Sequence, residues 1–265
     1  MGAITKLQAG GDTMKKLLLR GAALAALATG PALAADLSVP IYKAPPPLPV
    51  FSWTGCYIGG HIGGGYAWTE NTNAVNTTAF GDFIPGQGFS QPSSGVVGGG
   101  QLGCNYQIAR LVIGIEGTYS GANIKRDYLS PFGQFDDLYT NRIDSIATVV
   151  GRLGWAFDNW LFYSKAGWAG AHAKLSVADA IAPVGAGTDS HWHNGVTFGS
   201  GVEYGFTPNW IAGFETNYYR FESKSYEIGG GAGFYTFNSR PRDVYTFVGR
   251  LSYKFGWGGP VMAAY

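Results

Sequence analysis

Few residues of this 265-residue chain are spaced for metal or nucleotide chemistry. His191 and His193 could hold a metal ion, because alternate residues of a strand share a face. We find no third ligand for them and interpret them as exposed loop histidines. The run Gly98–Gly103 matches the glycine pattern of dinucleotide-binding proteins, which also needs a following helix and an acid about 20 residues later. Here Cys104–Tyr106 continues with strand periodicity, so we predict no cofactor and no enzyme activity.

The two cysteines of the chain, Cys56 and Cys104, lie on the same face of neighbouring predicted strands. Facing residues of an antiparallel pair have a constant sum of residue numbers. The cysteines give 160, and the neighbouring strand ends Trp68 and Ser94 give 162. They are therefore close enough to opposite for a cross-strand disulfide in an oxidising compartment. Two free cysteines that face lipid are the other interpretation.

Eight charged residues fall within the predicted strands, all on the face of small and polar residues. They are Glu116, Asp144, Arg152, Lys165, Glu203, Glu215, Arg250 and Lys254. A Lys or Arg that faces lipid near the membrane midplane costs about 2–4 kcal/mol, so these side chains belong inside a barrel. A buried charge is expensive unless it has a partner. We predict that Arg152, Lys165 and Arg250 form salt bridges with the three glutamates.

The elements that position these charges are eight segments in which apolar residues alternate with small or polar ones. In one of them, Ile113 and Ile115 alternate with Gly114 and Glu116. A period of two is typical of a strand whose two faces meet different surroundings. An even number of such strands is typical of bacterial single-chain membrane barrels.

The connections between the segments alternate in length. Three are tight turns: Gln107–Arg110, Asp158-Asn159 and Thr207–Asn209. The other four are long, polar and glycine-rich: Thr69–Ser94, Asn123–Arg142, Lys174–His193 and Glu222–Arg242. This alternation predicts an all-β fold, an eight-stranded antiparallel up-and-down transmembrane β-barrel with short periplasmic turns and four long external loops.

Composition and the N-terminal segment support an exported membrane protein. The chain has 42 glycines, 15% aromatic residues and only 13% charged residues, where about 25% is usual. A basic start after Met14, an apolar run at Leu24–Ala28 and small residues up to Ala34 indicate a cleaved signal peptide. The predicted parts are an upstream extension (1–13), the signal peptide (14–34), a proline-rich periplasmic tether (35–52), the barrel (53–256) and a tail (257–265). A net charge of +1 favours neither a nucleic-acid nor an acidic partner, and we predict no nucleic-acid partner.

Aromatic residues cluster near the tight turns and the two ends of the barrel segment. They are Trp53, Tyr57, Trp155, Phe157, Trp160, Phe206, Trp210, Tyr253 and Phe255. Amphipathic rings prefer membrane interfaces, so we predict that this set forms the periplasmic girdle. The core of a water-soluble β-sandwich is the other interpretation of these rings.

Two stretches resemble a known family. Phe51–Tyr66 (FSWTGCYIGGHIGGGY) is similar to the first strand of the opacity-like, porin-family small outer-membrane proteins, and Val248–Phe255 (VGRLSYKF) to their last strand. This family is allied to the transmembrane domain of outer-membrane protein A. The resemblance implies an abundant eight-stranded outer-membrane barrel with roles in envelope integrity and surface contact. It also implies contact with the barrel-insertion machinery through a terminal aromatic residue, for which Phe255 and Tyr265 are both candidates.

These features favour a structural, surface-exposed outer-membrane protein. Eight strands enclose a space just wide enough for side chains to fill, so a lumen of paired charges conducts poorly. The expected partners are outer-membrane lipid, the insertion machinery and unidentified surface ligands. A small porin or ligand channel, with Arg152, Lys165 and Arg250 along a narrow path, is the alternative function.

Overall fold

The computed structural model describes residues 51–76, 85–129, 137–179, 186–230 and 233–255. The predicted upstream extension, the signal peptide, the tether as far as residue 50 and the C-terminal tail lie outside the described residues. No helix within these five ranges is long and apolar enough to cross a membrane.

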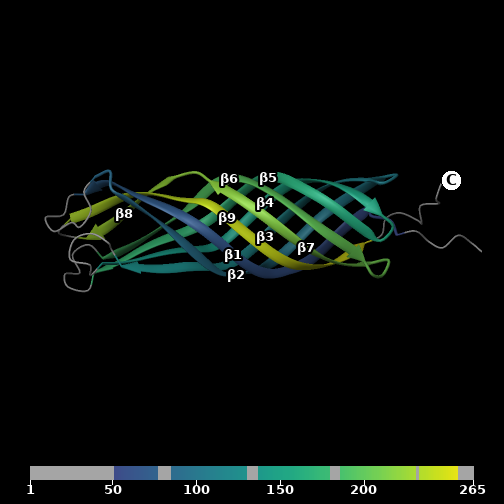
Figure 1. Ribbon diagram of the computed structural model, residues 1–265, viewed down its shortest axis with the longest axis horizontal. Coiled ribbons are helices and arrows are strands. Elements are labelled where there is room, and N and C mark those ends of the chain that lie inside the picture. Colours follow the sequence, from purple (N-terminus) through teal and green to yellow (C-terminus); the bar gives the residue numbers. More distant parts are fainter. Residues whose placement is uncertain (1–50, 77–84, 130–136, 180–185, 231–232, 256–265) are drawn as a thin grey trace, which may run out of the picture. The chain divides into compact units, whose positions relative to one another are not determined.

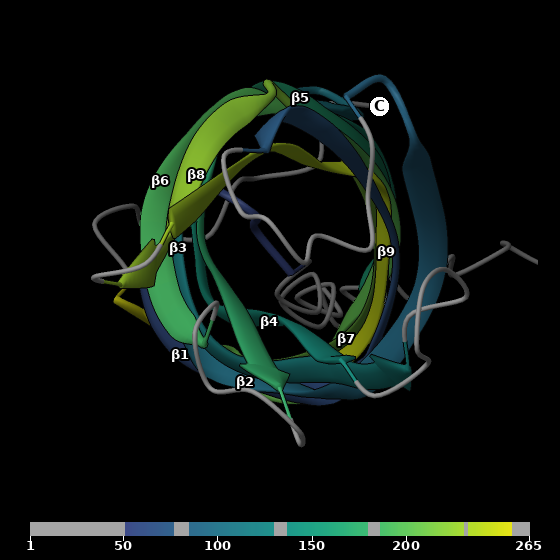
Figure 2. The same ribbon diagram turned by 90° about the vertical axis from the view of Figure 1, so that its left-hand side faces the viewer.

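The described residues form nine β-strands, joined antiparallel in one sheet (Figure 1). The strands are β1 (Gly55–Asn76), β2 (Gly88–Ile108), β3 (Leu111–Leu129), β4 (Asp137–Phe157), β5 (Trp160–Asp179), β6 (Gly187–Gly205), β7 (Trp210–Phe221), β8 (Lys224–Gly230) and β9 (Gly233–Phe255). Pairing follows chain order from β1 to β7 and then passes from β7 to β9. Because β9 also pairs with β1, the sheet closes, and Figure 2 shows the resulting ring end-on. The predicted antiparallel barrel is confirmed.

The seventh position of the ring is occupied by two strands in succession. β7 ends at Phe221 and pairs with the second half of β9. β8 begins at Lys224 and pairs with the first residues of β9. Since β8 runs along β9 beyond the end of β7, the nine strands occupy eight positions around the ring.

The strands extend far into the segments predicted to be external loops. β5, expected to end near Lys174, continues to Asp179. In this extension Leu175 and Val177 are buried inside the barrel, while Ser176 between them is more accessible. The pairing therefore continues because the extension has an apolar interior of its own.

Two of the predicted tight turns contain two residues each, Ala109-Arg110 between β2 and β3 and Asp158-Asn159 between β4 and β5. The first residue of each turn has a positive φ, 53° at Ala109 and 49° at Asp158. Aspartate tolerates this left-handed conformation, whereas alanine adopts it at a cost of about 1–2 kcal/mol. The short turns thus define one end of the barrel, called the turn end below.

The outer wall of the barrel is apolar in its middle. Ile62, Phe198, Phe214 and Phe247 point outward and are 58–73% exposed. Glycine permits close approach on the inner face, where a Cβ at Gly63 would lie 1.9 Å from the carbonyl oxygen of Phe247. An apolar outer band with small and polar residues inside is the arrangement of a membrane barrel.

Aromatic rings border this band at both ends. The girdle at the turn end contains Trp155, Phe157, Trp160, Phe206, Trp210, Tyr253 and Phe255, all exposed. A second girdle lies toward the other end and contains Tyr66, Trp68, Tyr119, Trp168, Trp192 and Tyr245. The assignment of Trp53 and Tyr57 to the girdle was wrong, because both side chains are buried within the barrel. Tyr57 has the inward parity of β1, and Trp53 packs against Phe51 beside the turn end.

The barrel interior is layered along its length, as one strand illustrates. On β5, Leu161 belongs to an apolar cluster at the turn end, and Lys165 to a charged layer above it. Ala171 and Leu175 then belong to two further apolar clusters. Along β5 the interior therefore passes from an apolar layer to a charged layer and then to two further apolar layers.

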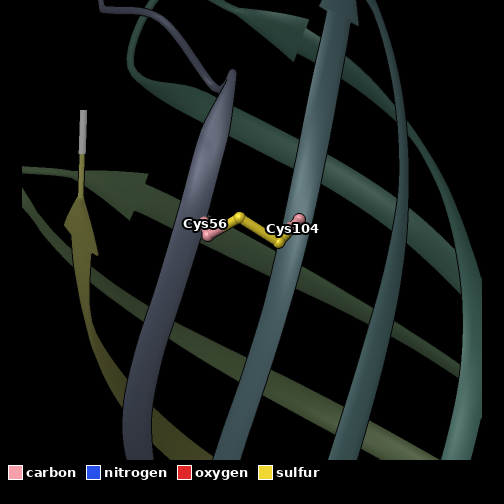
Figure 3. The surroundings of a disulfide bond; sticks show 2 residues. All are labelled: Cys56 and Cys104. Carbon is pink, nitrogen blue, oxygen red and sulfur yellow. A yellow bond between two sulfur atoms is a disulfide. The ribbon is translucent and has the colours of Figure 1, made fainter. Parts of the chain in front are cut away.

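The two cysteines lie on neighbouring strands near the turn end. Cys56 on β1 is directly opposite Cys104 on β2, and a disulfide with an S–S distance of 2.09 Å joins them (Figure 3). Both residues are exposed on the outer wall. The bond therefore links β1 to β2 on the lipid-facing side of the sheet.

Candidate functional site

Six charged side chains meet inside the barrel, and we call them the lumen cluster. They are Glu116 on β3, Arg152 on β4, Lys165 on β5, Glu203 on β6, Glu215 on β7 and Arg250 on β9. Each of the six lies at a position whose side chain points into the barrel, because alternate residues of a strand face opposite sides. Side chains from six strands of the ring therefore meet in one layer. All six side chains are at most 4% exposed.

Every cation of the lumen cluster is paired with at least two carboxylates. Arg152 contacts Glu203 at 2.9 Å and Glu116 at 3.4 Å. Lys165 contacts Glu215 at 2.7 Å and Glu116 at 3.2 Å. Arg250 contacts all three glutamates, with its Nε 3.2 Å from Glu203. These contacts supply the individual pairs that the sequence left unassigned.

Two tyrosines complete the charged layer. The Tyr57 hydroxyl donates to Glu116 at 2.7 Å and accepts from Arg152. The Tyr163 hydroxyl donates to Glu215 at 2.7 Å, and the Arg152 guanidinium lies 4.0 Å from the centroid of its ring. The guanidinium is thus held by carboxylates and also by an aromatic face, which attracts cations.

The arrangement is electrically neutral, with three bases and three acids in contact. Removing an ion from water costs several kcal/mol, and only close pairing with further hydrogen bonds offsets this cost. Each carboxylate of the cluster contacts two or three cations. The charges of the cluster therefore fix one another in position. Because they neutralise one another, they attract a passing ion only weakly.

A polar network continues the charged layer toward β1 and β2. His61 donates from Nδ1 to the Gln101 side-chain oxygen at 2.7 Å, and its Nε2 accepts from the Ser120 hydroxyl at 2.7 Å. Gln101 in turn donates to the Ser252 hydroxyl at 3.1 Å. Both ring nitrogens of His61 are thus bonded within the interior.

Apolar side chains lie on both sides of the lumen cluster. Toward the turn end the cluster is covered by Phe51, Trp53, Val112, Ala156, Leu161, Tyr163 and Ile211. On the opposite side the lumen contains Ala67, Val97, Ala122, Ile124, Ile143, Ile146, Ala169, Ala171, Ala173, Tyr219, Phe221 and Val244. An ion on the barrel axis would have to cross both apolar layers as well as the paired charges.

Two of the eight predicted charges lie outside the lumen cluster, and Asp144 is the first. The pairing of β4 with β5 shifts between Ile143 and Ser145, which changes the parity at this point. The Asp144 carboxylate therefore faces the outside, 2.5 Å from the Arg142 Nε and 3.6 Å from the His172 Nδ1. A bulge of this kind leaves no clear sign in the sequence.

The second exception is Lys254, which does point inward but at a different level. Its ammonium donates to the backbone oxygen of Ser52 and lies 4.2 Å from the centroid of the Phe51 ring. It belongs to the turn end, where it holds the segment before β1 inside the barrel. Lys254 was correctly assigned to the interior of the barrel.

Tyr57 and Tyr163 belong to this layer, although neither was predicted to join the charged network. Tyr163 shares the polar face of its strand with Lys165, and Tyr57 shares that of Gly59 and His61. Their parity was therefore a usable signal. Phenols are amphipathic, however, and at the edge of a predicted strand Tyr57 was assigned to the interface.

The two histidines first considered for metal binding lie on β6. His191 contacts Asp189 at 3.0 Å. His193 is buried, donates from Nδ1 to the Glu222 carbonyl at 2.8 Å and lies 2.7 Å from the Tyr226 hydroxyl. These bonds link β6 to the β7–β8 junction. Within the part of the chain that the structure covers, no group of three or more His, Cys, Asp or Glu is placed to hold a metal ion.

A closed antiparallel ring with an apolar band outside and a paired-charge core inside defines a transmembrane β-barrel. Residues 21–255 match the outer membrane protein beta-barrel domain family, and the chain belongs to that family. The protein is accordingly located in the bacterial outer membrane, with its turn end in the periplasm.

Its relatives include two immunogenic proteins. The chain is 30% identical over 207 residues to the 31 kDa outer-membrane immunogenic protein of Brucella melitensis, which covers 74% of this chain and 83% of the relative. It is 28% identical over 251 residues to the 25 kDa outer-membrane immunogenic protein of the same species, covering 92% of this chain and 99% of the relative. The structure of the outer membrane protein OprG from Pseudomonas aeruginosa is similar in fold. The TM-score is 0.50 at 13% identity, with 76% of this chain and 96% of OprG covered.

Proposed function

We propose that this protein is a structural outer-membrane barrel with a closed lumen, which acts through its outer wall and external end. The observation that carries the proposal is the lumen cluster, whose six paired charges lie between two apolar layers. Such a barrel contributes to envelope integrity by anchoring in lipid and presenting strands and loops to the surroundings. The names of the Brucella relatives, which describe immunogenic outer-membrane proteins, support exposure at the cell surface.

The proposal assigns the protein no catalytic role. The carboxylates of the lumen cluster and the hydroxyls of Tyr57 and Tyr163 bond with one another and with the cations of the cluster, which indicates a structural role. The partners we propose are outer-membrane lipid, the insertion machinery during assembly and ligands of the external surface, and we propose no nucleic-acid partner.

Planar bilayer recording tests the closed lumen. The refolded protein is expected to give no steady, ion-selective conductance. A reproducible conductance that changes in Arg152→Gln or Lys165→Gln would instead support the small-porin alternative. Arg110→Gln, which removes a cation from the exposed turn between β2 and β3, is the matched control.

Envelope integrity is tested in cells. A deletion strain should become more sensitive to detergent, and the wild-type gene should restore resistance. Complementation by a variant that folds and inserts but has an altered external end would separate anchoring from surface contact. Unchanged sensitivity of the deletion strain would refute the envelope role.

A further inference from the structure

We propose that the outer wall of β3, β4 and β5 binds one phosphorylated lipid of the outer leaflet. A row of three cations, Lys125, Arg142 and Lys174, would hold the phosphate group. An apolar groove that extends from β1 onto these strands would hold an acyl chain. The lipid class that this arrangement fits is a phosphorylated glycolipid such as lipid A. The inference rests on the outer-membrane location and does not depend on whether the lumen conducts.

The three cations stand side by side on neighbouring strands. Lys125 is directly opposite Arg142, and Arg142 is directly opposite Lys174. All three are exposed, and their sequence neighbours Ile124, Ile143 and Ala173 are buried in the lumen, so the charges face outward. Adjacent strands are about 4.8 Å apart, so the row spans roughly 10 Å.

Such a row is unfavourable on its own. Like charges directly opposite one another on neighbouring strands destabilise a sheet. Asp144 offsets part of the charge through its contact with Arg142. Lys125 and Lys174 flank that pair, which leaves a net positive surface on β3–β5. A bound anion between the cations would relieve the repulsion.

The position of the row along the barrel matches the headgroup layer. From Trp160 in the turn-end girdle to Lys174 is fourteen residues of β5, or about 48 Å of strand. At a strand tilt of about 40° this is roughly 36 Å along the membrane normal. The hydrocarbon core is about 30 Å thick, and with headgroups the bilayer is about 40–45 Å. The row therefore lies just beyond the hydrocarbon, where lipid phosphates are found.

Trp192 marks the same boundary independently. It is exposed on β6, directly opposite His172 of β5. His172 lies two residues before Lys174, nearer the middle of the barrel, and its side chain also faces outward. Tryptophan is enriched at membrane–water interfaces. The three cations thus lie immediately on the water side of the interface.

An apolar groove lies below the row and extends across β1 to β5, so part of it lies on these three strands. Gly117 and Ala147 form part of its floor, and Tyr119, Val149 and Trp168 project from its sides. A Cβ at Gly117 would come no closer than 3.8 Å to another heavy atom, so the glycine leaves open space on the lipid-facing wall. A groove at this depth is suited to an acyl chain whose headgroup reaches the row.

The charges on the far side of the ring are compensated. Arg242 on β9 contacts Glu70 on β1 at 2.5 Å and its neighbour Asp243 at 3.6 Å. A lipid phosphate approaching that side meets carboxylates, whereas on β3–β5 it meets mainly cations. The asymmetry places the site on one face of the barrel.

Lipid A binding to the full barrel tests the proposal, with bound lipid counted by native mass spectrometry from detergent micelles. The row variant carries K125Q, R142Q and K174Q. The control variant loses three cations elsewhere, through R110Q, R220Q and K224Q. A basic residue near an anionic membrane surface contributes about fivefold in affinity, so the row variant should bind about 100-fold more weakly. The control variant should bind within about threefold of wild type.

Two further experiments test the groove and the phosphate contact separately. Gly117→Leu fills the groove without changing charge and should weaken lipid A binding while heat-modifiable gel mobility shows an intact barrel. Dephosphorylated lipid A should lose most of its affinity for the wild-type barrel, and millimolar inorganic phosphate should not displace lipid A.

The proposal would be overturned if the row variant bound lipid A like wild type, or if the control variant lost as much affinity. Equal binding of dephosphorylated lipid A, or displacement by inorganic phosphate, would also overturn it, the latter by indicating a site for free phosphate. Planar bilayer conductance reports only on the lumen. Failure of the lipid site and failure of the closed-lumen proposal are therefore distinguishable.

Discussion

Arg250 is the side chain whose loss should damage the barrel most. It contacts all three glutamates of the lumen cluster, and it also donates to the Tyr163 hydroxyl at 3.1 Å. Replacing it with methionine keeps much of the volume and removes the charge. Three buried carboxylates then face only two cations. Breaking a buried ion pair by removing one partner costs about 3–5 kcal/mol, so Arg250→Met should lower the free energy of unfolding by that amount.

The assay is urea unfolding of the refolded barrel in detergent micelles, followed by tryptophan fluorescence and by gel mobility. Arg142→Met is the matched control, because the Arg142 side chain is 46% exposed and contacts a single carboxylate. An exposed ion pair contributes about 0–1 kcal/mol, so the control should unfold close to wild type.

A second variant tests whether charge imbalance is the cause. Combining Arg250→Met with Glu203→Gln restores two acids and two bases in the layer. Glu203 is the appropriate partner because Arg250 and Arg152 are its only cationic contacts among the described residues. Coupled neighbours show interaction energies of about 0.5–3 kcal/mol, so the double variant should be more stable than the two single effects predict. If Arg250→Met lost no more stability than Arg142→Met, the lumen cluster would not stabilise the barrel and the reasoning would be refuted.

Three further predictions concern other parts of the barrel. Reducing the Cys56–Cys104 disulfide, which closes a loop of 48 residues, should lower the free energy of unfolding by about 2–4 kcal/mol, and a double alanine variant should not respond to reductant. Phe247→Arg places a cation on the lipid-facing wall and should cost about 2–4 kcal/mol in lipid vesicles, with a smaller cost at a position outside the membrane. Ala109→Gly removes the strain of a positive φ in the turn and should raise the urea midpoint, by a free energy of about 1 kcal/mol; a lower midpoint would contradict this.

Much of the membrane-spanning part follows from the period of two. A one-residue change in register would exchange the two faces of a strand, so the alternation of Ile113 and Ile115 with Glu116 fixes which side faces lipid. The constant sum of facing residue numbers predicted the pairing of β1 with β2 to within two residue numbers. Their true sum is 160 throughout, as at Cys56 and Cys104, and the strand ends used in the sequence analysis gave 162.

Three residues were assigned to the wrong side of the barrel wall, and each error has a local cause that composition does not reveal. Asp144 was assigned to the lumen by counting parity, and the bulge beside it moves the carboxylate outside. Trp53 and Tyr57 were assigned to the girdle by residue type, although the parity of Tyr57 already pointed inward. Where parity and residue type disagreed, parity gave the correct side.

The external ends of the strands were predicted as loops because these segments are long, polar and glycine-rich, and their polarity pattern is in fact reversed. Within the membrane, β5 directs Phe162 and Trp168 outward and Lys165 inward; beyond it, Lys174 points outward and Leu175 inward. If every strand residue is expected to follow the membrane pattern, apolar outside and polar inside, the point where this pattern reverses is taken for the end of the strand. Its physical cause is the solvent, since the outer wall faces lipid along one stretch and water along the next.

This reversal also gives the interior above the membrane an apolar lining. Above the membrane the barrel must exclude water from its own interior, so its inner face carries Phe89, Tyr139, Leu175, Val177, Tyr226, Ile228 and Phe237. That apolar core stands above the lumen cluster and the apolar layer next to it. The lumen cluster is thereby kept from bulk water, and a charge pair is stronger in such surroundings. The stability of the paired charges at membrane depth therefore depends on the apolar core above them, and that core depends on the reversed pattern of the external strands. A change that admitted water to the external core would weaken the ion pairs beneath it.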